Sequence, residues 1–243
     1  MLSPRSRTTN IRLMQKEYAI IVAGGKGSRF GGSLPKQFLE LNGKPVLLHT
    51  LEAFFGYSEN ITVILVLPEE DVPAWKKIAN KHGFQKPVIL QTGGATRFQS
   101  VKKGLQMISG DGIVAIHDGV RPLVTPGIIG SSFIFARAHQ SAIATVRLKD
   151  SIRILDDAAS VSQSKAVDRS LFRKIQTPQT FHVSLIQKAY EIAEDPTLTD
   201  DASVAERAGY PIYLFEGSYE NIKITTPEDL VIAEALLSRR VRQ

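Results

Sequence analysis

The stretch "AIIVAGGKGSRFGGSLPKQF", residues 19–38, decides the fold, because an apolar run passes directly into a glycine-rich turn. Glycines at such a turn let backbone N–H groups approach an anion closely. They are Gly24, Gly25 and Gly27. Two cations follow them, Arg29 and Lys36. Cations beside unpaired amides suit a polyphosphate whose negative charge grows during a reaction. The stretch therefore predicts a strand that ends in a phosphate-binding loop.

Two common phosphate-binding patterns do not fit this turn. A G-x-x-x-x-G-K-[ST] spacing is absent, and Phe30 stands where a dinucleotide-binding fingerprint has glycine or alanine. The alternative interpretation is a glycine turn that is needed only for its backbone geometry. Arg29 and Lys36 favour the anion site over this alternative.

The rest of the chain alternates between strand-like and helix-like segments. Apolar runs predict strands at residues 18–23, 61–68, 87–94, 112–122, 141–147 and 212–216. Helical patterns occupy residues 45–55, 72–82, 97–108, 126–139, 184–194 and 200–208, and a last helix opens at Thr226 with a capping box. This alternation predicts an α/β fold with a doubly wound, mostly parallel sheet, whose ligands bind at the carboxyl ends of the strands.

Residues 149–175 interrupt the alternation. Apolar and polar residues alternate here around an Asp-Asp pair at 156–157, which is typical of a β-hairpin. We expect a β-arm that projects from the sheet.

Composition excludes several classes of protein. The 243 residues are 43% hydrophobic and 22% charged, which is ordinary for a globular chain with a large core. The chain has no cysteine, which excludes disulfides and thiolate metal sites. No apolar run reaches the length of about 18 residues that a membrane span needs. We therefore expect a cytoplasmic protein that has no membrane partner.

The net charge of +6 does not indicate a nucleic-acid partner, because much of the excess lies at the two ends of the chain. No basic stretch interleaved with aromatic residues appears between them. Residues 1–16 contain no acidic side chain and are expected to form a flexible extension, with a short transit peptide as the alternative. Residues 17–243 are then expected to form a single domain.

A second glycine turn follows another predicted strand. The segment "TGGATRFQSV", residues 92–101, carries Gly93, Gly94, Arg97 and Ser100. Since the carboxyl ends of parallel strands share one edge of a sheet, we expect both glycine turns to hold one ligand. The alternative for Arg97 is a surface residue in the first turn of a helix.

Three further segments carry candidate polar groups. In "IHDGVRP", Asp118 ends a strand and is placed to hold Mg²⁺ or a hydroxyl group, and Arg121 adds a contact for an anion. His117 points to the opposite face and is expected to be packed rather than to act as a base. Lys223 stands between isoleucines in a strand-like segment, as an anion contact or a snorkelling side chain. Thr199 is either a contact or the N-cap of the next helix.

Together these segments resemble one family, the cytidylyltransferases that load sugar-alcohol phosphates onto CTP. The similar stretches, which span residues 18 to about 236, are "AGGKGSRFGGSLPKQF", "TGGATRFQSV", "IHDGVRP", "VDRSLFRKIQTPQTF", "LTDDASVAERAG" and "NIKITTPEDL". The resemblance implies a Rossmann-like nucleotidyltransferase domain whose β-arm interlocks two subunits into a homodimer. It also implies transfer of CMP to a polyol phosphate, with release of pyrophosphate and with Mg²⁺ bound mainly by the CTP phosphates.

The resemblance further implies roles for individual residues. The nucleotide would be bound by Ala23, Gly24, Gly25, Gly27, Gly93, Gly94, Arg97 and Ser100. Arg29 and Lys36 would stabilise the transition state, while Arg169 and Lys223 would position the sugar phosphate, with Arg169 reaching across from the partner's arm. Asp118, Arg121 and Thr199 would make other contacts to that substrate.

Two substrates remain open within the resemblance. The segments "RFQSV" and "TDDAS" favour the 2-C-methyl-D-erythritol 4-phosphate branch, and ribitol 5-phosphate is the alternative acceptor. The sequence departs from the family pattern at "HDGVRP", where the family has HDAARP, so the packing between Asp118 and Arg121 differs.

Overall fold

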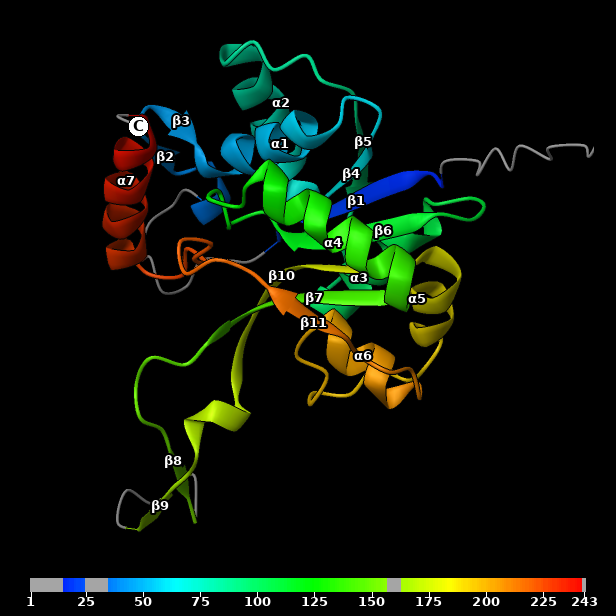
Figure 1. Ribbon diagram of the computed structural model, residues 1–243. Coiled ribbons are helices and arrows are strands. Elements are labelled where there is room, and N and C mark those ends of the chain that lie inside the picture. Colours follow the sequence, from blue (N-terminus) through cyan, green and yellow to red (C-terminus); the bar gives the residue numbers. More distant parts are fainter. Residues whose placement is uncertain (1–14, 25–34, 157–162, 242–243) are drawn as a thin grey trace, which may run out of the picture.

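The computed structural model describes residues 15–24, 35–156 and 163–241. Its centre is a seven-stranded sheet with the order β11-β7-β10-β6-β1-β4-β5 (Figure 1). The strands are β1 (Glu17–Val22), β4 (Thr62–Leu67), β5 (Val88–Thr92), β6 (Ile113–Asp118), β7 (Ser141–Arg147), β10 (Arg173–His182) and β11 (Leu214–Glu216). Neighbouring strands are parallel except at β10, which is antiparallel to both β6 and β7.

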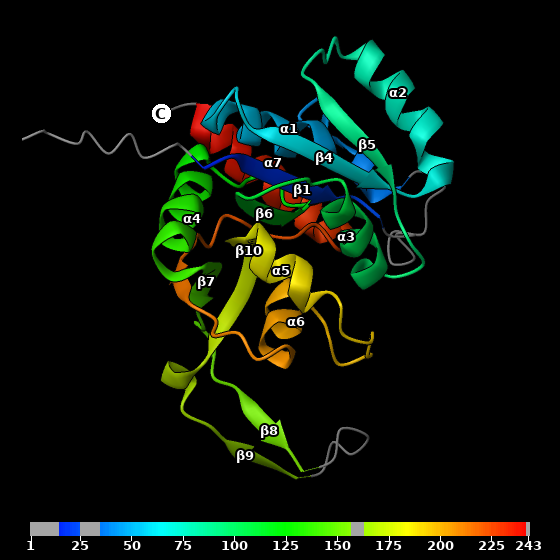
Figure 2. The ribbon, with the colours of Figure 1, turned by 90° about the vertical axis from the view of Figure 1, so that its right-hand side faces the viewer.

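Helices cover both faces of the sheet, as the predicted doubly wound fold requires (Figure 2). The face packed against α1 (Val46–Tyr57) and α4 (Pro126–His139) also receives Trp75 of α2 (Val72–Lys81). The other face is covered by α3 (Arg97–Gln106), α5 (Val183–Ala189) and α6 (Asp201–Arg207). The predicted α/β fold class is therefore confirmed.

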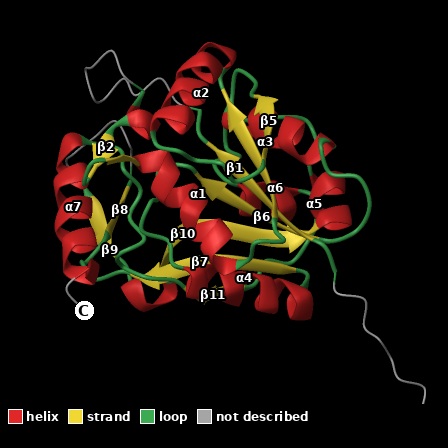
Figure 3. Cartoon of the chain, turned by 90° about the horizontal axis from the view of Figure 1, so that it is seen from above, coloured by secondary structure: helices red, strands yellow, loops and turns green. Residues whose placement is uncertain are grey.

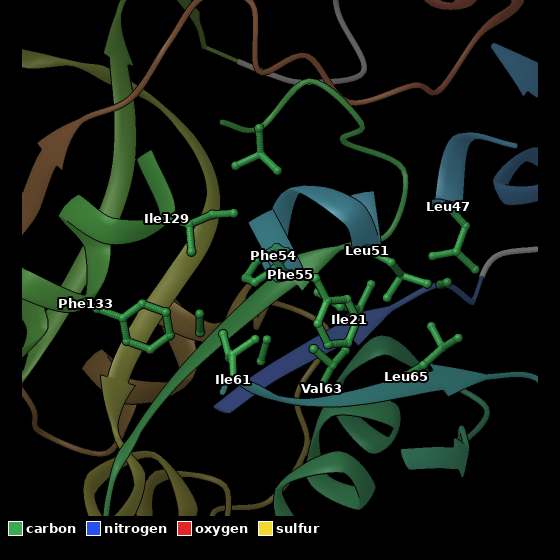
Figure 4. Close-up of a cluster of buried hydrophobic side chains, with 14 of the residues drawn as sticks. Ile21, Leu47, Leu51, Phe54, Phe55, Ile61, Val63, Leu65, Ile129 and Phe133 are labelled. Carbon is green, nitrogen blue, oxygen red and sulfur yellow. The ribbon is translucent and has the colours of Figure 1, made fainter. Parts of the chain in front are cut away.

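Side chains of β1 point alternately to the two faces of the sheet, so its apolar run needs helices on both faces. Ala19 and Ile21 pack on the α1 face, whereas Tyr18, Ile20 and Val22 pack on the α3 face. All five side chains are buried, which explains a continuous apolar run rather than an alternating one. Figure 4 shows Ile21 among the side chains of α1 and β4 on the first of these faces.

The strand β10 was not predicted, and its absence from the sequence interpretation is the main error about the sheet. Its central residues are polar but buried, namely Gln176, Thr177, Gln179 and Thr180. The pairing with β7 also changes register between Ile175 and Gln179, around Pro178, which has no N–H to donate. A run that contains glutamine, threonine and proline does not look like a central strand. In the structure these side chains make hydrogen bonds instead of packing in an apolar core: Gln176 to the loop before the C-terminal helix, Gln179 to the start of α6, Thr177 to β6 and Thr180 to Ser132 of α4.

The predicted arm is present as an extension of the sheet. Between β7 and β10 the chain leaves the sheet and forms a two-stranded hairpin of β8 (Arg153–Leu155) and β9 (Ser164–Ala166). Figures 1 and 2 show this hairpin projecting away from the sheet. Its last predicted residues belong to the sheet, because β10 already begins at Arg173. Its use in dimerisation stays a prediction.

The C-terminal helix α7 (Pro227–Val241) lies beside a small two-stranded sheet, β2 (Glu40–Leu41) with β3 (Lys44–Pro45) (Figure 3). Its first turn is held by Asp229, whose carboxylate accepts the N–H groups of Thr225 and Thr226 at 2.8 Å. Two details of the prediction were wrong. Lys223 lies in a loop rather than a strand, and α5 ends at Ala189 instead of continuing to residue 194.

No helix among the described residues is long and apolar enough to cross a membrane. Residues 1–14, which contain most of the predicted flexible extension, lie outside the described part of the chain.

The close packing of α3 on the sheet can be tested at Gly104. A Cβ atom there would lie 2.9 Å from Cγ2 of Ile20 and 3.2 Å from Cγ2 of Val66, so Gly104→Ala must push the helix away or displace the strands. We expect the free energy of unfolding in urea to fall by about 1–3 kcal/mol, despite the better helix propensity of alanine. Gly127→Ala in α4 is the matched control, since only Thr125 Oγ1 lies near, at 3.8 Å. Equal stabilities of the two variants would contradict this packing.

Candidate active site

The carboxyl edge of the parallel strands carries three adjoining cavities. The largest, of about 690 Å³, lies between the ends of β1, β4 and β5 and the start of α3, and we call it the glycine-loop cavity. A pocket of about 170 Å³, the Asp118 pocket, lies between the end of β6 and β10. A smaller linking pocket of about 80 Å³ shares Gly24 and Arg97 with the first and Asp118 and Lys223 with the second.

Members of the glycine-loop cavity come from both glycine turns, as the sequence predicted. They include Gly24, Gly93, Gly94, Arg97 and Ser100. The predicted Ala23 lines the linking pocket instead, where its N–H is donated to the Val66 carbonyl at 2.9 Å. Gly25, Gly27 and Arg29 lie outside the described residues.

The second glycine turn is held in place by side chains of α3. Ser100 Oγ accepts the Gly94 N–H at 3.0 Å and donates to the Thr96 carbonyl at 2.8 Å. Lys103 Nζ donates to the Gly93 carbonyl at 2.8 Å. A Cβ at Gly93 would lie 2.8 Å from Ser100 Oγ, so the turn can close on α3 only with glycine there. Ser100 thus shapes the wall of the cavity.

Asp118 is the centre of the site's electrostatics. Three cations surround its carboxylate: Arg121 Nε at 3.1 Å, Lys223 Nζ at 3.1 Å and Arg97 Nε at 3.6 Å. Burial by itself would raise the pKa of Asp118, but the charges of Arg97, Lys223 and Arg121 outweigh it and lower the pKa far below its usual range. Asp118 is therefore ionised, and the cluster of three cations and one carboxylate keeps a positive net charge.

Arg97 is neither a surface residue nor a simple neighbour of the glycine turn. Its guanidinium also binds Asp201 of α6 with two hydrogen bonds, of 2.9 Å and 2.7 Å. Burial would lower the pKa of Arg97, but Asp201 and Asp118 together raise it, so the cation is permanent. The alternative of a solvated surface arginine is wrong, because Arg97 bridges two carboxylates.

The loop that carries Lys223 is fixed by buried polar groups. Arg121 donates through NH1 to the Asn221 carbonyl at 2.9 Å. Gln176 of β10 donates to the carbonyls of Ser218 and Asn221, at 2.8 Å and 3.2 Å. Asn221 in turn donates to the Thr177 carbonyl at 2.8 Å. The antiparallel strand thus sets the position of Lys223 at the edge of the Asp118 pocket.

Lys36 reaches the linking pocket from a short 3-10 helix, η1 (Lys36–Phe38). Gln37 Nε2 donates to Asp71 Oδ2 at 2.8 Å, and Phe38 is buried in the core on the α1 face. Burial raises the pKa of Asp71. The hydrogen bond of Gln37 and the burial of Phe38 fix the segment from which Lys36 projects.

The family departure at "HDGVRP" has a steric counterpart. A Cβ at Gly119 would lie 2.8 Å from the Cβ of Ala23 and 3.1 Å from Leu47 Cδ1. Gly119 therefore lets the loop after Asp118 lie close against the first glycine turn.

The two remaining predicted residues are placed differently from each other. Thr199 lines the Asp118 pocket, and the alternative that made it an N-cap is wrong, because Asp200 caps α6 in a capping box with Ser203. Arg169 lies exposed on the arm, in the short helix η3 (Arg169–Leu171), where its guanidinium donates to the Lys149 carbonyl. The described part of the chain does not bring Arg169 to its own Asp118 pocket.

Sequence reasoning missed several residues of the site. Asp201 and Gln179 have no chemical motif of their own, although "TDDAS" stood out as a segment. Both polar atoms of the Gln179 amide bind the start of α6: Nε2 donates to Asp200 Oδ2 at 2.9 Å, and Oε1 accepts the Ala202 N–H at 2.8 Å. The available signal for Asp201 was a second aspartate directly after Asp200, in the first turn of a predicted helix.

An α/β sheet with two glycine turns and converging cations at its carboxyl edge is typical of nucleotide-binding enzymes. The family model of "2-C-methyl-D-erythritol 4-phosphate cytidylyltransferase" (IspD) matches residues 18–239. The chain belongs to this family of nucleotidyltransferases.

Individual relatives agree with the family match. The enzyme of that name from Bacteroides fragilis is 48% identical over 219 residues, which is 90% of this chain and 98% of the relative. The crystal structure of 4-diphosphocytidyl-2C-methyl-D-erythritol synthase from Anaerococcus prevotii has a TM-score of 0.78 at 30% identity, covering 92% of this chain and 96% of that one. The crystal structure of 2-C-methyl-D-erythritol 4-phosphate cytidylyltransferase from Thermus thermophilus has a TM-score of 0.69 at 29% identity, covering 93% of this chain and 100% of that one.

His117 lies on the sheet face opposite to Asp118, as predicted, with its ring 5.2 Å from that of Phe54. It is fully buried, and its Nδ1 lies 3.0 Å from Thr177 Oγ1. Burial is the main reason why the pKa of His117 falls to about 3. At neutral pH the ring is therefore uncharged, which is consistent with a packed residue and not with a base.

The depressed pKa of His117 predicts how stability depends on pH. Above about pH 6.5 the ring is neutral in both states, and below it only the unfolded chain takes up the proton until about pH 3. The group thus costs about 1.4 kcal/mol of stability per pH unit as the pH falls through this window. His117→Gln should therefore show a shallower loss between pH 6.5 and 4.5 in urea unfolding, whatever its stability at pH 7. The exposed His139→Gln is the control, and parallel curves for wild type and His117→Gln would contradict the prediction.

Proposed function

We propose that this chain transfers CMP from CTP to 2-C-methyl-D-erythritol 4-phosphate. The products are 4-(cytidine 5′-diphospho)-2-C-methyl-D-erythritol and pyrophosphate. The observation that carries the proposal is the convergence of Arg97, Arg121 and Lys223 on Asp118, beside a cavity walled by glycine turns. Family membership supplies the identity of the two substrates.

The reaction needs charge neutralisation more than proton transfer. An anionic oxygen of the acceptor's phosphate attacks the α-phosphorus of CTP and forms the new P–O bond. The bond from that phosphorus to the oxygen bridging toward the β-phosphate breaks, and pyrophosphate leaves with the electron pair. Because the attacking phosphate is already an anion, no general base is required. Positioned cations that stabilise the transition state can then supply most of the catalysis.

We assign the two larger cavities to the two substrates. The glycine-loop cavity takes the nucleotide, with backbone groups of Gly24, Gly93 and Gly94 close to the ligand. The Asp118 pocket takes the polyol phosphate, where the carboxylate accepts a hydroxyl and Lys223 meets the phosphate. Lys36, in the linking pocket, then lies where the α-phosphate would sit, with Arg29 as its expected companion.

We propose Mg²⁺ as the divalent cation and CTP as its main carrier. The described residues contain no group of three or more His, Cys, Asp or Glu side chains that could hold a metal ion. Asp118, the candidate protein ligand, is already paired with three cations, so a metal there would have to compete with Lys223. This arrangement fits an ion that arrives on the phosphates, as Mg²⁺ commonly does. When bound, it neutralises charge on the triphosphate and on the leaving pyrophosphate.

We also propose that the chain works as a homodimer, with Arg169 of one subunit completing the acceptor site of the other. The arm exposes apolar side chains that a monomer leaves in water, with Leu171 81% and Ile154 58% exposed. Leu155 and Phe172 add to the same surface. Contact with a second copy would bury them. We place this dimer in the cytoplasm, where CTP is available.

The proposed reaction is tested by pyrophosphate release from CTP, Mg²⁺ and 2-C-methyl-D-erythritol 4-phosphate. We expect turnover with CTP and at least tenfold less with ATP, GTP or UTP, since each base must fit the same glycine-walled cavity. Ribitol 5-phosphate is the competing acceptor, and we expect it to be a poor substrate. Turnover with ribitol 5-phosphate and not with 2-C-methyl-D-erythritol 4-phosphate would show that the proposed acceptor is wrong. No pyrophosphate release with any nucleotide would refute the reaction.

Subunit mixing tests whether Arg169 acts across the dimer. We expect Lys36→Ala and Arg169→Ala each to have low activity at limiting acceptor concentration. In a mixed dimer, the subunit that retains Lys36 receives the intact Arg169 of its partner, so one complete site forms. We therefore expect activity to rise when the two variants are exchanged together, toward about a quarter of the wild-type value at equal amounts. Mixing without any gain would place Arg169 outside the partner's site.

A further inference from the structure

A series of polar contacts connects Tyr190, which is buried on the α3 face of the sheet, to Asp118. The Tyr190 hydroxyl, just after α5, donates to Asp201 Oδ1 at 2.6 Å. The two oxygens of Asp201 accept N–H groups from Nη1 and Nη2 of Arg97, and Arg97 Nε lies 3.6 Å from Asp118. Four elements (α5, α6, α3 and β6) thus meet through one chain of polar groups.

This chain is closed off from water at its inner end. Asp201 is 0% exposed, and Tyr190 is almost as buried, with its ring 4.7 Å from that of Phe98. A buried carboxylate is costly unless it is fully paired. Arg97 and Tyr190 provide that pairing, through three hydrogen bonds to the two carboxylate oxygens.

Arg97 is the one residue that lines all three cavities within the described part of the site. A guanidinium has five N–H donors. Two of them are donated to Asp201, and Nε lies 3.6 Å from Asp118, which makes an ion pair but no hydrogen bond. The described residues show no hydrogen bond from the other three donors. The plane of the guanidinium, and hence the direction of the remaining donors, is set by the Asp201 carboxylate.

We propose that Asp201 and Tyr190 are positioning residues, which fix the guanidinium of Arg97 at the junction of the nucleotide and acceptor pockets. The inference rests on the proposed function, because it assigns these pockets to two substrates that must meet in line. A guanidinium held by two carboxylates keeps its remaining donors fixed while charge moves from the attacking to the leaving phosphate. Asp201 itself touches neither substrate and acts only through Arg97.

The first test uses turnover. We expect Asp201→Asn, which keeps the shape but loses one acceptor oxygen and the charge, to lower kcat about tenfold. Affinity for CTP in calorimetry should change by less than about threefold, since the backbone walls of the nucleotide cavity stay in place. In an Arg97→Met background, Asp201→Asn should change kcat by less than about twofold, because the route through Arg97 is already gone. An Asp201→Asn variant that melts earlier but keeps its kcat would overturn the proposal, as would an equal loss in both backgrounds.

The second test uses Tyr190→Phe, which removes one hydroxyl and leaves every charge in place, so it guards against a failure of Asp201→Asn to fold. We expect kcat to fall about twofold to fivefold. Tyr210→Phe is the matched control in the same apolar cluster and should keep its kcat within about 1.5-fold. Equal kcat values for the two variants would overturn the role of Tyr190.

A readout without turnover separates this inference from the reaction itself. The NMR signal of the Arg97 Nε–H group can be identified by its loss in Arg97→Met. We expect it to be sharp in the wild type and in Tyr210→Phe, and broadened in Tyr190→Phe. A wild type that releases no pyrophosphate yet shows this pattern would refute the proposed function and keep the positioning role. A signal that is unchanged in Tyr190→Phe would refute the positioning role even in an active enzyme.

Discussion

The ionised carboxylate of Asp118 is the constraint on which the rest of the site depends. It lies at the end of a fully buried strand, and the three cations that hold it come from α3, from the loop after β6 and from the loop before α7. Each of those cations would repel the other two without it. This carboxylate, together with Asp201 on the far side of Arg97, allows three positive side chains to lie close together. Three cations and two carboxylates leave a net positive charge, which still attracts phosphate.

The antiparallel strand β10 is the second support of the site. A strand parallel to its neighbours would end at the carboxyl edge of the sheet, where the site lies. The antiparallel β10 begins at this edge instead, so its first polar side chains contact the segments that form the site. Gln176 binds the loop before α7, and Gln179 binds the start of α6. Thr177 Oγ1 accepts the N–H of Asp118 at 3.1 Å. Two buried amides and one hydroxyl of a single strand therefore fix three segments that arrive from distant parts of the sequence.

The sequence was sufficient for the parts of the fold that follow from short-range patterns. Buried parallel strands such as β4 and β6 appear as continuous β-branched or apolar runs, and the glycine turns follow β1 and β5 at the predicted edge. It was not sufficient for β10, because its buried side chains are polar and their hydrogen-bond partners lie far away in sequence. Arg97 was found through its glycine turn, but its pairing with Asp201 could not be, since a carboxylate 104 positions away is recognisable only once α3 and α6 pack together.

The arm between β7 and β10 has a consequence for how this protein can vary. Arg147 is paired with Arg173, so the chain leaves and re-enters the sheet at neighbouring points. The intervening hairpin is therefore an insertion whose two ends lie side by side. Changing the length of such an insertion costs little conformational entropy, about 0.6 kcal/mol for a doubling of its length. The arm is therefore a module whose length and sequence can drift without disturbing the sheet. In the proposed dimer, the specificity of pairing between chains could change in the arm outside Arg169 without altering the catalytic residues of the sheet, which would let two co-existing homologues avoid assembling with each other.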